Sequence, residues 1–321
     1  MIEVHGLRKS YGAKDVVRGI DFEVSTGEIF GILGPNGAGK TTTVECIGGL
    51  RQRDAGEIRV AGFDPANEAR ELREALGIQL QESRLPDKQT VGEAMRLYSS
   101  FYDSPRDWRE LIERLGLGSK ESTYFAKLSG GQKQRLSVEL ALIGNPKVAI
   151  LDELTTGLDP GARREVWGLL EDLKDTGVTF LLVSHFMEEA QRLCDRVAVI
   201  NDGRIAALGT PTELATAVDA DQRMSFVSSH PVNLATLTSL PDVHRAEQIG
   251  DRIQVTGTDN VATTVIIALH EQGITAQKLR VDQPNLDDAF VALTDGAVAS
   301  ADGAHQHATT TSNRATEGTR P

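Results

Sequence analysis

Residues 34–41 carry the strongest chemical signal in the sequence. They read Gly-Pro-Asn-Gly-Ala-Gly-Lys-Thr, which fits the phosphate-binding pattern G-x-x-x-x-G-K-[ST]. The glycines let the backbone curl so that several N–H groups point at phosphate oxygens, at a helix N-terminus whose dipole also favours an anion. We expect Lys40 to bring a positive charge to the outer phosphates of a nucleotide and Thr41 to offer its hydroxyl to Mg²⁺. The other residues expected to contact the nucleotide here are Gly34, Pro35, Asn36, Gly37, Ala38, Gly39 and Thr42.

A second chemical group follows the apolar segment Val148–Leu151, which is predicted to be a buried strand. This segment ends in two carboxylates, Asp152 and Glu153. Nucleotide hydrolysis needs a carboxylate that holds Mg²⁺ and a group that positions or deprotonates water. We expect Asp152 to hold Mg²⁺ and Glu153 to take a proton from the attacking water. The alternative, an ordinary acidic pair at a strand end, is disfavoured by the phosphate-binding loop upstream.

The elements around these groups predict an α/β fold. Ile29–Leu33 is an apolar strand directly before the loop, and the residues after Thr41 can form a helix. Strand and helix patterns then alternate from Val148 to Ile200, and Asp202-Gly203 turns the chain into another strand. Between them, residues 86–144 are mainly helical, with a capping box at Thr90 and an N-cap at Asp107. We therefore expect a nucleotide-binding domain over residues 1–218, with a helical subdomain inside it.

Beyond this domain the pattern changes twice. Residues 220–296 show the order β-α-β-β-α-β, which predicts a small α+β ferredoxin-like domain, followed by a closing helix at Leu286–Leu293. Residues 297–321 contain no aromatic residue and, among the large aliphatic residues, only Val298. Because so little apolar area is available to offset the entropy of ordering, this tail is predicted to be disordered.

Bulk composition limits the classes of partner. The 321 residues carry a net charge of −12, which argues against a broad electrostatic contact with nucleic acid. No stretch of about 20 apolar residues is present to span a bilayer, and residues 1–4 do not show a signal-peptide pattern, so we expect a soluble chain inside the cell. The two cysteines, Cys46 and Cys194, are far apart in apolar surroundings and suit a reducing compartment.

The segment Leu128-Ser129-Gly130-Gly131-Gln132 resembles the signature motif of the ATP-binding subunits of ABC transporters. The resemblance implies a P-loop ABC ATPase cassette with a mixed sheet core and a helical subdomain, using ATP and Mg²⁺ as cofactors. Ser129, Gly130, Gly131 and Gln132 would open a helix that forms a second site for the γ-phosphate. In the family this site serves the nucleotide of another subunit. It therefore implies a head-to-tail homodimer that encloses two ATP molecules.

Other positions match the family one by one. Tyr11 resembles the aromatic residue that stacks on adenine, and Asp159, in Gly157-Leu158-Asp159, resembles the D-loop residue. Gln81 resembles the Q-loop glutamine that senses the γ-phosphate and magnesium, and its spacing to Thr90 favours it over Gln79. His185 resembles the switch histidine that contacts the γ-phosphate. The resemblance thus implies catalytic roles for Glu153, His185 and Gln81, and magnesium contacts from the set Thr41, Gln81 and Asp152.

Residues 151–160 are similar to a drug-export branch that includes the daunorubicin-resistance ATPases, although Leu154 stands where the family usually has proline. This resemblance implies a separate polytopic membrane permease, export of a drug-like or lipid-like substrate, and a location on the cytoplasmic face of the cell membrane. The alternative is a soluble ABC ATPase acting on ribosomes or DNA. Those proteins usually carry two cassettes or an inserted coiled coil, and neither pattern occurs in this sequence.

Overall fold

The computed structural model describes residues 1–80, 85–174, 176–217, 222–282, 286 and 290 of the chain. The fold divides into two compact units, Met1–Pro211 and Thr212–Gly296, which are described separately here. Gln81 and the predicted tail, residues 297–321, lie outside the described residues.

The first unit is built on a six-stranded sheet with the order β5-β6-β7-β3-β8-β9. The first five of these strands run parallel, and β9 runs antiparallel to β8. Strands β3, β6 and β7 are buried along their whole length, as their uninterrupted apolar sequences predict. The strands are β5 (Leu76–Gln79), β6 (Val148–Asp152), β7 (Thr179–Val183), β3 (Ile29–Leu33), β8 (Arg196–Asn201) and β9 (Arg204–Gly209).

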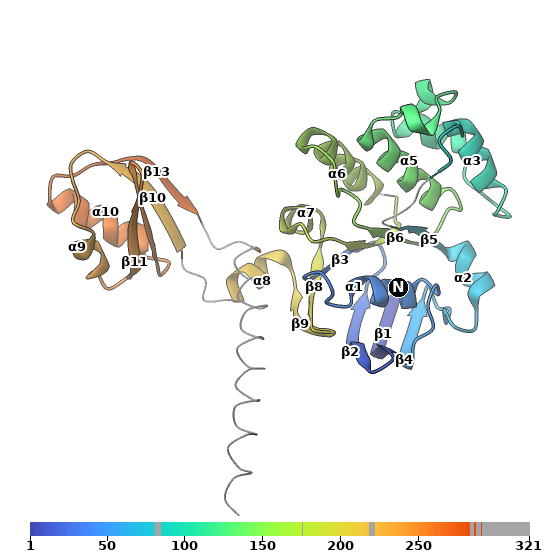
Figure 1. Ribbon diagram of the computed structural model, residues 1–321, viewed down its shortest axis with the longest axis horizontal. Helices are drawn as coiled ribbons and strands as arrows, with labels where there is room; N and C mark the ends of the chain where they lie inside the picture. The colour runs from blue at the N-terminus through green and yellow to red at the C-terminus, as the bar shows by residue number, and fades with distance from the viewer. Residues whose placement is uncertain (81–84, 175, 218–221, 283–285, 287–289, 291–321) are drawn as a thin grey trace, which may run out of the picture. The chain divides into compact units, whose positions relative to one another are not determined.

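A second, antiparallel sheet in the same unit has the order β2-β1-β4. Its strands are β1 (Ile2–Tyr11), β2 (Lys14–Val24) and β4 (Ala55–Val60). Helix α1 (Lys40–Ile47) lies between the two sheets (Figure 1), and its Val44 and Ile47 join one apolar core with residues of both sheets, such as Val4 and Ile32. The helix that follows the phosphate-binding loop is therefore fixed from both sides.

Helices make up the rest of the first unit. The capping box at Thr90 and the N-cap at Asp107 are both present, as predicted. A separate apolar core that includes Met95, Trp108 and Leu136 joins α3, α4 and α5. The helices are α2 (Ala69–Ala75), α3 (Val91–Ser99), α4 (Trp108–Arg114), α5 (Gly130–Leu142), α6 (Pro160–Lys174) and α7 (Met187–Leu193), with 3₁₀ turns at Gly118–Lys120 and Phe125–Lys127. The predicted α/β core with a mixed sheet and a helical region is thus confirmed.

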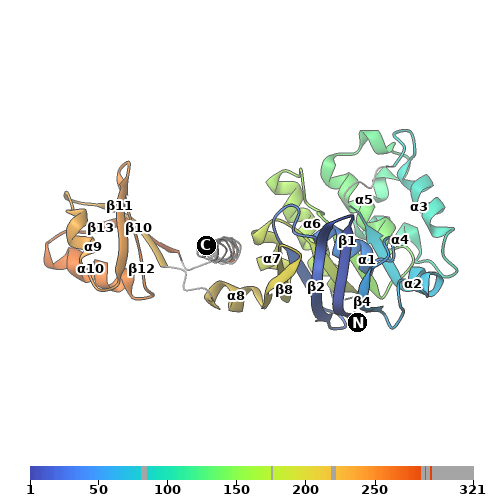
Figure 2. The same cartoon turned by 60° about the horizontal axis from the view of Figure 1, so that its bottom comes forward.

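The second unit is ferredoxin-like, as predicted. Its four strands are paired antiparallel in the order β11-β12-β10-β13. Both of its main helices lie on the same side of this sheet (Figure 2), where Phe226, Val255 and Leu269 form the centre of the core. Its elements are β10 (Gln222–Ser228), α9 (Leu234–Thr238), β11 (Val243–Ile249), β12 (Arg252–Gly257), α10 (Val261–Glu271) and β13 (Ala276–Asp282), and helix α8 (Pro211–Ala217) begins at the boundary with the first unit.

The end of the second unit differs from the prediction in one strand boundary, and its predicted closing helix lies largely outside the described residues. The last strand begins at Ala276 and not at Ile274, because the Ile274 N–H donates to the Leu269 carbonyl and closes the end of α10. Of the predicted closing helix, only Leu286 and Phe290 are described, and both are helical. Within the described part of the chain, no helix combines the length and the apolar character that crossing a bilayer requires.

Candidate nucleotide site

A cavity of about 530 Å³ lies at the carboxyl ends of the parallel strands of the first unit. It brings together residues that are far apart in the sequence: the phosphate-binding loop, Glu153 after β6 and His185 after β7. The ends of parallel strands are the usual place for a ligand in an open α/β sheet. The lining residues are Val16, Asn36, Gly37, Gly39, Lys40, Thr41, Thr42, Glu153, Thr156 and His185.

The phosphate-binding loop connects β3 to α1 and needs glycine for close contacts. A Cβ atom at Gly34 would lie 2.2 Å from the Ile200 carbonyl oxygen, and one at Gly39 would lie 2.7 Å from the Val16 carbonyl oxygen. Gly39 also has φ +102°, a conformation that other residues rarely adopt. Gly34, Pro35 and Ala38 belong to the loop but do not line the cavity. The loop therefore approaches two neighbouring backbones without intervening side chains.

Lys40 curls back over this loop. Its Nζ donates to the carbonyl oxygens of Gly34 at 2.7 Å and Pro35 at 3.1 Å. Burial lowers the pKa of the Lys40 ammonium, whereas the charges of Glu153 and Asp152 oppose that shift. The ammonium is thus held at the loop by neutral carbonyl partners, which an anionic phosphate could replace.

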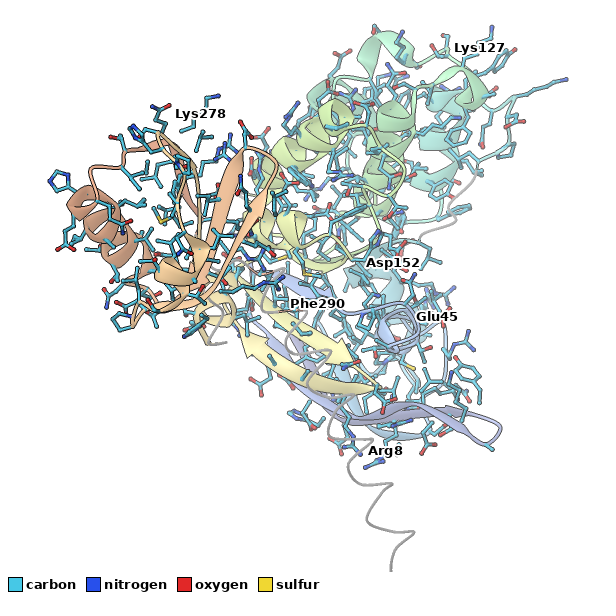
Figure 3. The ribbon with its side chains drawn as sticks, turned by 60° about the vertical axis from the view of Figure 1, so that its left-hand side comes forward. Arg8, Glu45, Lys127, Asp152, Lys278 and Phe290 are labelled. Carbon is cyan, nitrogen blue, oxygen red and sulfur yellow. The ribbon has the colours of Figure 1, made fainter. Side chains whose placement is uncertain are left out.

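Asp152 ends β6 and is almost completely buried, with 1% of its surface exposed. Its Oδ1 atom has no hydrogen-bond partner among the described residues. The pKa of this carboxyl is raised to about 6, mainly by burial and then by the charge of Glu153, with Glu45 adding to the rise and Lys40 opposing it. Figure 3 labels Asp152 on β6 and Glu45 on α1. A buried carboxylate oxygen without a partner fits a hard divalent cation.

Glu153 occupies a strained position. Its φ of +49° lies in the left-handed region, which costs a residue other than glycine about 1–3 kcal/mol. The backbone is held there because the Glu153 N–H donates to the Val183 carbonyl at 2.9 Å and so extends the pairing of β6 with β7. Its Oε1 atom lies 3.4 Å from His185 Nδ1. The strain thus accompanies a fixed carboxylate–imidazole pair at the edge of the cavity.

The sequence pattern missed three residues of this neighbourhood. Thr156 lines the cavity, with its Oγ1 3.5 Å from Glu153 Oε2, and its place between Glu153 and Gly157 was an available signal. Val16 also lines the cavity, but a valine in a strand gives no chemical signal. Phe186 packs on His185 with ring centroids 4.0 Å apart.

Several predicted residues lie outside the cavity lining. Ser129 caps α5 with its side chain, and Gln132 reciprocates, so both belong to a capping box. Asp159 caps the start of α6 by accepting from the N–H groups of Gly161 and Ala162. Tyr11 is 42% exposed at the end of β1, with the Arg51 guanidinium 5.1 Å from its ring centroid. The structure therefore brings the loop, Glu153 and His185 together, whereas the cavity lining does not include Tyr11, Ser129, Gly130, Gly131, Gln132, Asp159 or the buried Asp152.

Gln79, the alternative to Gln81, has a buried side chain whose Nε2 donates to the Leu80 carbonyl at 2.8 Å. The prediction for Gln81 concerns a residue that the structure does not describe.

A sequence profile of the family described as ABC transporter matches residues 17–156. The chain is 32% identical to the linearmycin resistance ATP-binding protein LnrL of Bacillus subtilis, an alignment that covers 92% of this chain and 98% of the relative. This chain belongs to the ATP-binding subunits of ABC transporters. As a member of that family it is an ATPase, and ATP is its nucleotide.

Further relatives of this ABC subunit carry names of export and resistance proteins. It is 37% identical to the Nod factor export ATP-binding protein I of Rhizobium sp. (strain N33), over 91% of this chain and 96% of the relative. It is 36% identical to the daunorubicin resistance ATP-binding protein DrrA3 of Streptomyces coeruleorubidus, over 91% of this chain and 95% of the relative.

Solved structures agree on the cassette fold. An ATP binding subunit of an ABC transporter superposes with a TM-score of 0.61 at 29% identity, covering 68% of this chain and 92% of that one. The dimeric structure of MJ0796, a bacterial ABC transporter cassette, gives a TM-score of 0.59 at 26% identity, over 65% of this chain and 98% of that one.

Proposed function

We propose that this ABC subunit couples ATP hydrolysis to the export of a drug-like or lipid-like substrate through a separate polytopic permease, on the cytoplasmic face of the cell membrane. The observation that carries the proposal is the cavity in which Lys40, Glu153 and His185 meet. The relatives named for linearmycin resistance, Nod factor export and daunorubicin resistance support export over an action on ribosomes or DNA.

Magnesium is the cation that fits this site. Among the described residues, no three His, Cys, Asp or Glu side chains gather to hold a metal by themselves. Magnesium is usually bound by one or two carboxylates together with substrate phosphates, and the unpartnered Asp152 Oδ1 suits that role. We assign the contacts to Asp152 and Thr41, with Gln81 as a third. When bound, the ion neutralises charge on the phosphates.

The chemistry that we propose uses the chain's own groups. Backbone N–H groups of the phosphate-binding loop and the Lys40 ammonium hold the phosphates of ATP. A water attacks the γ-phosphorus while Glu153 accepts its proton, the bond from the γ-phosphorus to its bridging oxygen breaks, and ADP and phosphate leave. His185, 3.4 Å from Glu153, contacts the γ-phosphate. Tyr11 stacks on the adenine.

A second copy of the chain completes each site. Ser129, Gly130, Gly131 and Gln132 form the start of α5 outside the cavity lining, so they are available to the nucleotide of another subunit. Asp159, at the start of α6, is likewise outside the cavity lining and is proposed to contact the nucleotide of the other subunit. We therefore propose a head-to-tail homodimer with two ATP molecules between its subunits, a form supported by the dimeric cassette structure of MJ0796.

The permease would dock on exposed apolar side chains of the first unit. Phe101 is 63% exposed, and Leu97 on α3 and Leu50 after α1 are also exposed. Leu50 lines an apolar cavity of about 270 Å³ beside α2 and β5. We propose that these side chains form part of the contact with the permease, since a contiguous exposed apolar patch is typical of a protein contact site. We propose a cassette domain over residues 1–218, with its helical subdomain at 86–144, and an accessory role for the domain at 220–296 in assembly.

Co-expression with a polytopic membrane protein encoded in a neighbouring gene tests the proposal. The tagged ABC subunit should purify from the membrane fraction with that protein, and its ATPase rate should rise when transported compounds are added. The Glu153→Gln variant is the control, because it should assemble equally well and hydrolyse almost no ATP. A chain that sediments with ribosomes or binds DNA, and stays out of the membrane fraction, would contradict export in favour of the alternative.

A further inference from the structure

The Asp202-Gly203 turn between β8 and β9 has no role in the mechanism described above. Asn201 pairs with Arg204, so the hairpin loop consists of these two residues alone. Both have positive φ, +48° at Asp202 and +73° at Gly203. Asp-Gly is a preferred sequence for such a two-residue loop, because both positions require a left-handed backbone. The local sequence therefore determines the shape of this turn.

The turn connects the phosphate-binding loop to β2. The Gly203 N–H donates to the Ala38 carbonyl at 3.0 Å, and the Gly203 carbonyl accepts from the Arg18 N–H at 2.7 Å. In a planar trans peptide the C=O and N–H groups point in opposite directions. The bond to the Ala38 carbonyl therefore directs the next N–H group, that of Gly39, away from the turn. Gly39 lines the nucleotide cavity, where such a donor can meet a phosphate oxygen.

Close packing reinforces this arrangement. A Cβ atom at Gly203 would lie 2.5 Å from the Val16 carbonyl oxygen, the same atom that excludes a side chain at Gly39. A side chain at position 34 is likewise excluded by the Ile200 carbonyl oxygen, near the end of β8. The phosphate-binding loop, the β8–β9 turn and β2 thus touch backbone to backbone, so a shift of the turn must move the loop.

An ion pair holds the turn from outside. Arg18 Nη1 lies 2.5 Å from Asp202 Oδ2, and Arg18 Nε also donates to the Asp15 carbonyl at 3.3 Å. Both charged side chains are partly or largely exposed, and exposed pairs contribute little stability. We therefore expect the Arg18–Asp202 ion pair to affect the position of the turn more than the free energy of unfolding.

We infer that the Asp202-Gly203 turn is a positioning element for phosphate binding, which orients the Gly39 amide through the Ala38 carbonyl. The inference rests on the proposed ATP site. Gly203 does not line the nucleotide cavity; it acts through the phosphate-binding loop.

Gly203→Ala in the full chain tests this, with Gly177→Ala as the matched control. Gly177 has nearly the same φ, +79°, but no atom within 4 Å of the added Cβ. ATP affinity is measured by calorimetric titration with EDTA present, next to thermal unfolding. We expect Gly203→Ala to bind ATP about tenfold more weakly, the scale of one charge-assisted hydrogen bond, and to raise KM more than it lowers kcat. Gly177→Ala should lower the thermal stability without changing the affinity for ATP.

Arg18→Ala provides a second variant that adds no atoms near the backbone. It should weaken ATP binding about two- to threefold, within the range of an exposed ion pair, and Arg18→Lys should restore it. Unchanged ATP affinity in folded Gly203→Ala overturns the inference, as does unchanged affinity in Arg18→Ala if Gly203→Ala does not fold. If the unaltered chain binds no ATP, the proposed function fails first, so the two failures can be told apart.

Discussion

Two helices of the cassette begin on glycine-rich segments, but they are capped differently. Helix α1 has Gly39 as its N-cap, and no side chain caps its first turn. Helix α5 has Ser129 as its N-cap, whose Oγ accepts from the Gln132 N–H at 3.2 Å, while Gln132 Oε1 accepts from the Ser129 N–H at 3.0 Å. The first four N–H groups of any helix need partners. Helix α1 leaves its donors to a ligand, whereas α5 satisfies two of them by itself.

This difference indicates an order of events. A phosphate can bind at α1 of an isolated subunit, since no side chain occupies its first-turn donors and an anion can replace the carbonyl partners of Lys40. A phosphate at α5 must compete with the capping box. In the proposed dimer, we therefore expect the contact at α5 to form after the nucleotide has bound at α1 of the other subunit. The predictions below test each side of this comparison.

The largest expected effect is on hydrolysis. Glu153→Gln should retain ATP binding but slow turnover about 10²- to 10⁴-fold, equal to about 3–5 kcal/mol of barrier, because the general base is lost. With hydrolysis so slow, the pairing of α5 with a neighbouring nucleotide should persist, and gel filtration with Mg-ATP should show a dimer. A purely monomeric elution would contradict either the base assignment or the paired sites.

Lys40→Ala acts on the α1 side alone. It should weaken ATP binding about 100-fold, or about 3 kcal/mol, because a charge-assisted contact to phosphate is lost from a buried position. Fluorescence titration with a labelled ATP measures this, and the thermal transition should be retained because Lys40 contacts loop carbonyls and not the core. Wild-type affinity in this variant would remove the phosphate-binding loop from the mechanism.

Ser129→Arg acts on the α5 side alone. Placed in the Glu153→Gln background, it should leave ATP affinity unchanged and weaken the ATP-dependent dimer at least tenfold, because the long side chain blocks the neighbouring γ-phosphate. Ser129→Asn is the control, since asparagine caps a helix as well as serine does. Sedimentation velocity with Mg-ATP distinguishes the two. A stable dimer of Ser129→Arg would mean that α5 does not face a second nucleotide.

A smaller effect concerns pH. The pKa of Asp152 is raised to about 6 in the folded chain from an ordinary value of 3.8, because burial disfavours its charge. Between these values the folded state binds the proton more tightly, so this group favours folding at low pH and loses that contribution as pH rises through about 6. Asp152→Asn should therefore be more stable than the parent by about 1–3 kcal/mol at pH 8 without metal, and the difference should vanish near pH 4. Thermal melts in EDTA across this pH range measure the difference in stability. A difference that does not change with pH would mean that the Asp152 carboxyl is solvated and its pKa is not raised.

The smallest effect is expected from the second unit. Removing residues 220–321 should leave ATP affinity unchanged, because the residues that line the cavity all precede Pro211. Co-purification with the permease or the lifetime of the dimer should decrease, whereas removal of residues 297–321 alone should change neither. Full transport by a chain that ends near Asp219 would reduce this unit to a passive appendage.

The sequence predicted the elements that local rules control. Uninterrupted apolar strands, the caps at Thr90 and Asp107, and the Asp202-Gly203 turn each follow from a few neighbouring residues. The ferredoxin-like order of the second unit was also predictable, because each of its elements has its own period. Ser129-x-x-Gln132 also fits the capping-box pattern, so the sequence already indicated that α5 caps its own first turn.

What the sequence could not provide depends on contacts between distant segments. The left-handed φ of Glu153 arises because its N–H must meet the Val183 carbonyl on the next strand. The contribution of Val16 comes from a backbone oxygen, which any residue type would supply. The 3.4 Å separation of Glu153 and His185 depends on the register of β6 and β7. Such features need the assembled sheet.

The strand order of the central sheet also determines when the nucleotide site can exist during synthesis. Among the described residues, β3, which leads into the phosphate-binding loop, pairs with β7 and β8 alone, and both follow it by most of the length of the first unit. The antiparallel sheet of β1, β2 and β4 can form early, because its strands are close in sequence. The phosphate-binding loop lacks its neighbouring strands and the bond from Gly203 to Ala38 until residues through Gly203 have left the ribosome. A nascent chain should therefore acquire ATP binding in a single late step, and not gradually with length.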